Sequence, residues 1–478
     1  MNEPREQQPG TSDGSIGDGD AGLAQAARDA DRLAFGPQLP ERLDLRACLA
    51  ATVLGVLTGA VAVLYRQALD GAIRLHDGAR AYLAMHGVAG WLGLLALTAA
   101  VGALARLLVE RFSPESAGSG IPSVEARLQD GSRLRWPRIL PVKFAGGLLA
   151  LATGMSLGRE GPTVQIGAAL GEAVSGRGAR DARTRAALVA AGAGAGLAGA
   201  FGAPIAGLLF VLEELRFALV PLTYATALLA CLACQLVVRT FLGSAPILGA
   251  IDPAPLGGVG LALAAGCGVV CGLVGVLYNA AILAALDLAD ALSAVPGWVR
   301  AALGACCAIP VAAFVPDALF GNENVVGRLL HDTTAPGPDA IAALAFLAAA
   351  KIAFTATSYA TGVVGGLFAP QLVIGAALGA MLGKLAAPLL PGVPLATILA
   401  AAGAAAIFTA SVRVPLTGIV LLLEMTGANR QIFALAIAAA AAYLVATALR
   451  SLPIYEALGA RAVRSVGATE RRRRAQSA

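Results

Sequence analysis

Long apolar segments recur along the chain between about residues 47 and 450, and polar residues are concentrated between these segments and at the two ends. The clearest runs cover residues 88–105, 219–238, 257–286 and 432–449. A membrane-spanning helix needs about 20 mostly apolar residues, so the pattern predicts roughly a dozen or more membrane helices. Some runs are too short to cross a bilayer or are interrupted by Gly and Pro.

The overall composition leads to the same class of protein. Hydrophobic residues make up 57% of the chain and charged residues only 14%, and the mean hydropathy is +0.74. Such a chain has lipid rather than water as its main solvent. We therefore expect an all-α polytopic membrane protein.

The ends of the chain are polar. Residues 1–44 are rich in Asp, Gly, Gln and Ala and lack the basic stretch and apolar core of a signal peptide. We expect a disordered cytoplasmic tail there. Two membrane halves should follow, at residues 45–243 and 244–458, and a basic cytoplasmic tail at residues 459–478.

Arginines indicate how the chain is oriented. Four lie between residues 177 and 185, and another four form the run 471–474. The positive-inside rule places both segments, and hence both termini, on the cytoplasmic side of a cell (inner) membrane. Acidic lipid is the expected partner of the terminal run. Nucleic acid is not expected as a partner, because the net charge is only +5 and most of the chain is embedded.

The chain also contains an internal repeat. The segment "AGAGAGLAGAFGAPIAGLLFVLEEL" from Ala191 matches "AGAAAIFTASVRVPLTGIVLLLEMT" from Ala402, at an offset of 211. The shorter "GREGP", which begins at Gly158, matches "GLFAP", which begins at Gly366, at an offset of 208. Two similar offsets predict a duplicated membrane protein with its binding site at the junction of the halves, where interrupted helices meet.

Three interrupted segments, "GSGIP", "GREGP" and "GGLFAP", share one chemistry. Their glycines let the backbone approach a ligand closely, and their prolines suit the first turn of a helix. The free amides and the positive dipole end of such a helix attract anions. The three segments together predict an anion pathway formed by helix N-termini.

Other kinds of chemistry have little support. The seven cysteines lie in apolar segments, and "CLAC" at 231–234 has no second Cys pair or polar His beside it, so we expect packing roles. We expect no metal or other cofactor. A membrane hydrolase is conceivable because "GSG" resembles a nucleophile turn, but the only histidines are His76, His86 and His331. We therefore expect no enzyme.

The order of the motifs points to a known family. From about residue 43 to 458 the chain contains "GSGIP", "LPVKF", "GREGP", "APIAGLLFVLEEL", "GGLFAP", "VPLTGIVLLLEMT" and "LPIYEAL". In these motifs it resembles the CLC chloride channels and proton/chloride exchangers. The resemblance implies a homodimer in which each subunit has its own anion pathway between two inverted halves. The chain ends soon after "LPIYEAL", so we expect no nucleotide-binding regulatory domain.

The resemblance also implies which residues bind chloride, the expected substrate. The central site would combine the hydroxyls of Ser119 and Tyr455 with the backbone amides of Leu367 and Phe368. Further chloride-binding positions would be the backbone amides of Gly118 on the inner side and of Arg159, Glu160 and Gly161 on the outer side, together with Ala369. The Arg159 side chain is expected to support the local structure or field instead of binding the ion directly. Relatives that prefer nitrate tend to have proline in place of this serine, so Ser119 predicts a preference for chloride. Without the flanking motifs, Ser119 would be interpreted as a helix cap and Tyr455 as an interfacial aromatic residue.

Three glutamates carry the predicted proton chemistry. Glu160 lies where a helix N-terminus attracts an anion, so its carboxylate can fill the outer site and leave when chloride displaces it or a proton neutralises it. Glu214 matches the internal proton-transfer glutamate of the family, and Glu213 precedes it as a possible support. We expect a proton-coupled chloride antiporter. The alternative is a passive chloride channel, gated by voltage or pH, with the same fold.

Overall fold

The computed structural model describes residues 44–178, 181–216, 220–332, 334, 337–462 and 464. The expected N-terminal tail, except for Asp44, lies outside the described residues, and so do most of the basic C-terminal tail and its arginine run 471–474. Where the structure describes the chain, it is helical except for loops and two isolated β-bridges. Ten helical segments of the described residues are long and apolar enough to cross a membrane, and one of them, Gly297–Phe314, consists of two consecutive helices.

The first half contains eight of the described helices. They are α2 (Leu45–Ala84), α3 (Gly87–Phe112), α4 (Ile121–Asp130), α5 (Trp136–Ala152), α6 (Glu160–Gly178), α7 (Ala182–Phe201), α8 (Pro204–Glu213) and α9 (Pro221–Leu242). A 3-10 turn, η1 (Pro114–Ser116), precedes α4. The apolar runs predicted at 88–105 and 219–238 fall in α3 and α9, although residues 217–219 lie outside the description.

The second half follows a similar order. Its described helices are α10 (Gly258–Ala291), α11 (Gly297–Cys306), α12 (Ala308–Phe314), α13 (Glu323–Leu330), α14 (Pro338–Ala360), α15 (Phe368–Ala386), α16 (Leu395–Val412), α17 (Pro415–Thr426) and α18 (Ile432–Ala448). The 3-10 turns are η2 (Pro316–Ala318), η3 (Ala387–Leu389) and η4 (Asn429–Gln431). The predicted runs at 257–286 and 432–449 correspond to α10 and α18.

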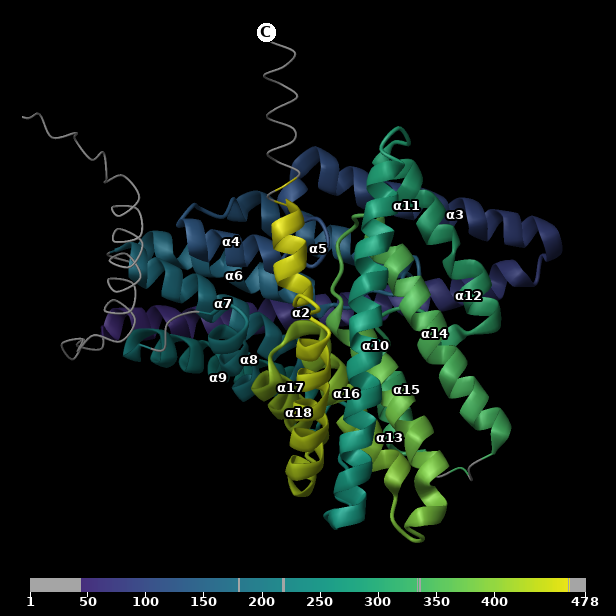
Figure 1. Ribbon diagram of the computed structural model, residues 1–478. Helices are drawn as coiled ribbons and strands as arrows, with labels where there is room; N and C mark the ends of the chain where they lie inside the picture. The colour runs from purple at the N-terminus through teal and green to yellow at the C-terminus, as the bar shows by residue number, and fades with distance from the viewer. Residues whose placement is uncertain are drawn as a thin grey trace, which may run out of the picture. The chain divides into compact units, whose positions relative to one another are not determined.

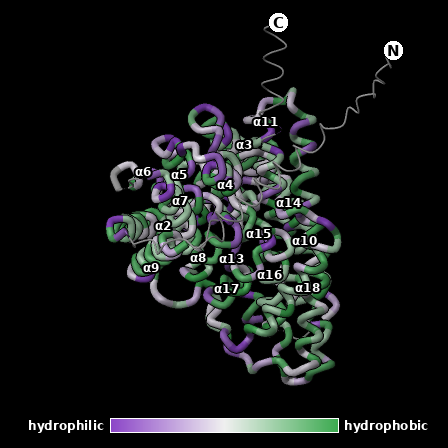
Figure 2. Tube along the Cα trace, turned by 60° about the vertical axis from the view of Figure 1, so that its left-hand side comes forward, coloured by the Kyte–Doolittle hydropathy of each residue, from purple (hydrophilic) through white to green (hydrophobic). Residues whose placement is uncertain are grey.

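Hydropathy is distributed as a membrane protein requires. Hydrophobic residues predominate along α9, α10, α14 and α18, whereas hydrophilic residues gather at loops and helix ends (Figure 2). In Figure 1, α6, α7 and α9 run across the view and α10, α14, α15 and α18 run down it. The helices α8 and α17 are apolar but too short to span a bilayer by themselves.

The duplicated segments form equivalent helix pairs. In the first half α6 packs extensively on α7, and in the second half α15 packs extensively on α16. A Cβ atom at Gly167 of α6 would lie 2.0 Å from the carbonyl oxygen of Gly192, and one at Gly375 of α15 would lie 2.3 Å from that of Gly403. Glycines at equivalent repeat positions therefore allow the same close helix contact, which small residues provide in membranes.

The two halves have opposite topology. Glu213 at the end of α8 accepts hydrogen bonds from the first turn of α17, and Glu424 near the end of α17 accepts them from the first turn of α8. The two helices are therefore antiparallel. Because α8 and α17 occupy equivalent places in the repeat, the halves are inverted relative to each other, as the predicted fold class requires.

Candidate functional site

Three broken segments meet between the halves. Gly158 and Gly366 form an antiparallel bridge in which each amide donates to the carbonyl of the other, at 2.9 and 2.8 Å. Gly118 pairs with the neighbouring loop, since its amide donates to Val363 and its carbonyl accepts from Gly365. These contacts bring together the N-terminal ends of α4, α6 and α15, which the sequence predicted as the anion pathway.

The Glu160 carboxylate lies at the centre of this junction. Its Oε1 atom accepts hydrogen bonds from the backbone amides of Phe368 (2.7 Å) and Ala369 (3.2 Å), the first two residues of α15. The residue is completely buried, and its Oε2 atom has no hydrogen-bond partner. A negatively charged group thus occupies a helix N-terminus, a place where an anion binds readily.

Two bridged glycines form the walls around this carboxylate. A Cβ atom at Gly158 would lie 2.0 Å from Glu160 Oε2, and one at Gly366 would lie 2.3 Å from Oε1. No side chain larger than hydrogen fits at either position while Glu160 is in place. The duplicated motif therefore contains glycine because the backbone itself must line the site.

Ser119 lies against the same junction. A Cβ atom at Gly161 would lie 2.9 Å from Ser119 Cα and 3.0 Å from Gly366 Cα. The Ser119 hydroxyl accepts from the amide of Ile121 at 3.3 Å, and the residue is fully buried. The hydroxyl hydrogen is therefore available to donate to a bound anion.

Tyr455 reaches the junction through aromatic packing. Its ring contacts that of Phe368 edge to face, with centroids 5.4 Å apart. Phe368 makes similar contacts with Phe210 (6.1 Å) and Phe408 (4.8 Å). Tyr455 is fully buried and its hydroxyl has no partner, although buried polar groups are usually hydrogen-bonded. A donor that lacks a partner here suits the binding of an ion or water.

The structure gives other contacts to the remaining predicted chloride-binding residues. The Arg159 guanidinium forms an ion pair with Glu323, with Nη2 and Oε2 3.4 Å apart. The carbonyl of Gly118 accepts from the ammonium of Lys143 at 2.9 Å. Leu367 accepts from the hydroxyl of Tyr278 through its carbonyl at 3.2 Å.

Lys143 itself is fully buried. Its Nζ atom donates to the carbonyls of Ser116 (3.1 Å) and Gly118 (2.9 Å). These two contacts hold the loop that carries Ser119. Lys143 therefore has a structural role at this loop.

The second predicted carboxylate, Glu214, lies at a separate cavity of about 380 Å³ that we call the Glu214 vestibule. Its lining includes Glu125, Glu213, Glu214, Arg216 and Glu456. The side chains of Glu125 and Glu214 are hydrogen-bonded to each other, which requires a proton on one of them. Burial raises the pKa of Glu125, on the short helix α4 outside the long spans, to about 7.

Glu213 has a different environment from its neighbour. Its carboxylate accepts from the amides of Leu416 (3.1 Å) and Thr417 (2.6 Å) and from the Thr417 hydroxyl (2.7 Å). The nearby Arg216, which the sequence places close to Glu213, pairs instead with Glu456 at 2.9 Å. Glu213 therefore supports the junction of α8 and α17.

Sequence reasoning missed several polar residues around these sites. The Tyr359 hydroxyl lies 3.5 Å from the Ser119 amide, Tyr278 contacts Leu367, and Glu125 contacts Glu214. The sequence offered two signals. Tyr359 lies in an apolar run six residues before Gly365, and Glu125 lies four residues after Ile121. Lys351, at an offset of 208 from Lys143, was also overlooked.

The fold and the junction define a class of protein. Two inverted membrane halves meet at helix N-termini that hold a buried carboxylate, with neutral hydroxyl donors beside it. This is the architecture of a membrane transport protein for anions. The family described as "Voltage gated chloride channel" matches residues 101–447. The chain therefore belongs to this family, the CLC family.

Known relatives cover most of the chain. It is 37% identical over 431 residues to the H(+)/Cl(-) exchange transporter ClcA of Salmonella paratyphi B. The matched region covers 88% of this chain and 89% of the relative. The crystal structure of a slow cyanobacterial Cl-/H+ antiporter superimposes with a TM-score of 0.82 at 30% identity, over 88% of this chain and 99% of that one. A eukaryotic CLC transporter shares the fold, with a TM-score of 0.72 at 22% identity over 87% of this chain and 74% of that one.

Proposed function

We propose that the protein is an antiporter that moves chloride and protons in opposite directions across a membrane. The observation that carries the proposal is the Glu160 carboxylate bound to the first amides of α15. A carboxylate and a chloride ion suit the same backbone donors, so each can replace the other. Only the carboxylate can also take up a proton, and this links the two ions at one position.

The exchange follows from the two states of Glu160. As a carboxylate it occupies the outer chloride position and closes it. When it takes up a proton it loses the charge that binds it to the amides, and chloride can enter the vacated position. The proton then leaves in the opposite direction, and the carboxylate displaces chloride again. Ser119 and Tyr455 would bind the ion at the central position through neutral donors, which suit a mobile ion.

Glu214 would supply protons from the other side. It is nearly buried, with 9% of its surface exposed, and it lines the Glu214 vestibule. Its hydrogen bond to Glu125 provides a place for a proton that is separate from the chloride path. Since the repeat has Met425 at the equivalent position, this acid belongs to one half only.

The test is proton movement driven by chloride. Purified protein is reconstituted in vesicles, a chloride gradient is imposed, and external pH is recorded with and without a proton carrier. An antiporter moves protons against their gradient, and the proton carrier abolishes that signal. Chloride flux with no such movement would support the alternative, a passive channel with the same fold.

Further parts of the proposal concern the setting of the protein. We place it in the inner membrane with both termini cytoplasmic, contacting lipid and assembled as a homodimer, with no nucleic acid, cofactor or enzymatic activity. Large apolar side chains exposed on α9 and α18, such as Leu236 (67%) and Phe433 (72%), are compatible with both lipid and a second copy. Crosslinking in native membranes, followed by mass measurement, distinguishes a dimer from a monomer.

A further inference from the structure

The loop before α13 is the counterpart of the loop that carries Ser119. Lys351, at an offset of 208 from Lys143, is fully buried on α14. Its Nζ atom donates to the carbonyls of Ala318 (3.1 Å), Leu319 (3.2 Å) and Phe320 (2.5 Å). Each lysine thus holds the backbone ahead of a short helix in its own half, α4 or α13.

This second loop lies directly against the Glu160 site. A Cβ atom at Gly321 would lie 3.1 Å from Gly158 Cα and 3.0 Å from Ala369 Cβ. Gly321 therefore packs between the two segments that hold the Glu160 carboxylate. The start of α13, which follows Gly321 in the chain, is therefore positioned beside the anion pathway.

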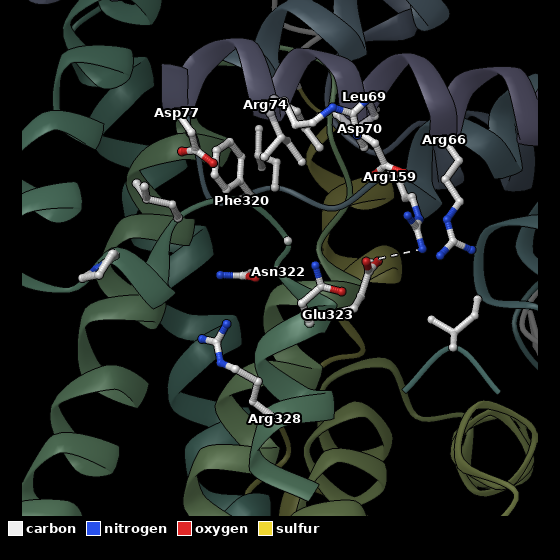
Figure 3. A pocket seen from close by; sticks show the side chains of 18 of the residues that line it. Arg66, Leu69, Asp70, Arg74, Asp77, Arg159, Phe320, Asn322, Glu323 and Arg328 are labelled. Carbon is white, nitrogen blue, oxygen red and sulfur yellow. Dashed lines mark ion pairs between the residues drawn. The ribbon is translucent and has the colours of Figure 1, made fainter. Parts of the chain in front are cut away.

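The first residue of α13 is Glu323. Its carboxylate lies 3.4 Å from the guanidinium of Arg159, the residue immediately before Glu160 (Figure 3). Both side chains are mostly buried, at 14% and 8% exposed. The ion pair therefore has less screening by water than a surface pair, and each charge depends more on the other.

This pair lines a large cavity that we call the Arg159 vestibule. Its volume is about 710 Å³. Eight charged residues line it, five arginines and three acids: Arg66, Arg74, Arg80, Arg159 and Arg328 against Asp70, Asp77 and Glu323. A cleft lined mainly by positive charge concentrates anions from solution. Arg159 is the arginine of this set that adjoins Glu160 in the chain, and Glu323 neutralises it.

We propose that Glu323 controls access of chloride to the Glu160 site by competing with the ion for Arg159. With the ion pair formed, an arriving chloride finds the guanidinium already neutralised. When the carboxylate turns away, Arg159 attracts the ion toward the junction. The inference rests on the proposed chloride transport but adds a residue to it, because it assigns a regulating role to an acid outside the relay of Glu160 and Glu214.

A purely structural role gives a different expectation. An acid in the first turn of a helix stabilises it through the helix dipole, and Glu323 could serve only to fix α13. In that case removing its charge would lower stability and leave the chloride dependence of transport unchanged.

The experiment measures exchange of isotopically labelled chloride in vesicles with equal chloride on both sides. For Glu323→Gln we expect the half-saturating chloride concentration to fall about three- to tenfold, which is the effect of removing one partly screened competing charge. The matched control is Asp317→Asn, which removes one negative charge next to the same vestibule. Asp317 pairs with Arg328 instead of Arg159, and we expect little change.

Glu323→Asp separates contact from charge. It keeps the negative charge but shortens the side chain, so we expect the half-saturating concentration to fall here too, by less than in Glu323→Gln. An unchanged half-saturating chloride concentration in both Glu323 variants would overturn the proposal. An equal fall in Asp317→Asn would overturn it too, because the effect would then come from the overall charge of the vestibule and not from the contact with Arg159. Isotope exchange needs no proton coupling, so this measurement can be interpreted even if the antiport assay shows no proton movement.

Discussion

Glu213 and Glu424 lie 211 positions apart, and each carboxylate binds the first turn of the helix that carries the other. Glu424 accepts from the amides of Ile205 (3.1 Å) and Ala206 (2.8 Å). Glu213 accepts from Leu416 (3.1 Å) and Thr417 (2.6 Å). This reciprocal capping connects α8 to α17. It gives Glu213 a structural function that its position next to Glu214 in the sequence does not indicate.

We predict that Glu213→Gln and Glu424→Gln destabilise the protein to a similar extent. Each substitution removes charge from a capped helix N-terminus, at a cost of about 1 kcal/mol. Thermal unfolding in detergent measures the loss. The ratio of protons to chloride should stay at the wild-type value in both variants. Loss of coupling in Glu213→Gln alone would instead place Glu213 in the proton path.

The substitution Glu160→Gln should separate the two ions. Glutamine resembles the protonated side chain, carries no charge to bind the α15 amides and cannot exchange a proton. Chloride flux should therefore continue while proton movement stops and the pH dependence of flux fades. Simultaneous records of chloride and pH in vesicles test this. Continued uphill proton movement would remove Glu160 from the proposed gate.

Glu214→Gln should also stop proton movement while chloride flux persists. Here the flux should keep a dependence on pH, because Glu160 still titrates. If the variant pumps protons at the wild-type ratio, the two-glutamate relay is wrong.

Glu125, which contacts Glu214, should affect the pH dependence of proton transport. Its raised pKa, about 7, means that it gains a proton as pH falls through neutrality. A neutral glutamine at this position removes the negative charge beside Glu214 that is present above pH 7. Glu214 should then give up its proton more easily, so proton transport in Glu125→Gln should reach half its maximum at a lower pH. The pH profile of coupled transport measures the shift, and a profile identical to wild type would show that Glu125 has no influence on Glu214.

Ser119→Pro should shift selectivity from chloride toward nitrate. The substitution removes the hydroxyl donor and also the backbone amide hydrogen. Competition between the two anions in flux assays reports the change. Ser119→Ala is the control that removes only the hydroxyl, and it should weaken chloride binding. If both variants keep the wild-type chloride preference, Ser119 does not contact the ion.

Gly366→Ala should reduce chloride transport at least tenfold, since the added methyl group would lie 2.3 Å from Glu160 Oε1 and 2.8 Å from the Gly161 amide. Neither the carboxylate nor an anion could then use the site as it is. Gly266→Ala is the matched control, because a methyl group there meets nothing within 4 Å. Equal flux in the two variants would contradict the assignment of the bridged glycines as walls of the site.

Much of the architecture could be predicted without coordinates. Apolar runs long enough to span a bilayer specify membrane helices locally, because backbone groups in lipid must bond within their own helix. The offsets of 211 and 208 revealed the duplication, and Gly and Pro marked the interrupted helices near Glu160. These are properties of neighbouring residues, which a linear pattern records.

The contacts between distant segments were decided by the tertiary structure. No local pattern shows that Glu160 binds amides some 208 positions away, that Glu323 pairs with Arg159, or that Glu125 meets Glu214. Glu213 and Glu214 are adjacent in the chain and equally acidic, yet successive residues of a helix point in different directions. Glu213 therefore caps α17 and Glu214 contacts Glu125, and only the packing of the two inverted halves assigns these separate environments.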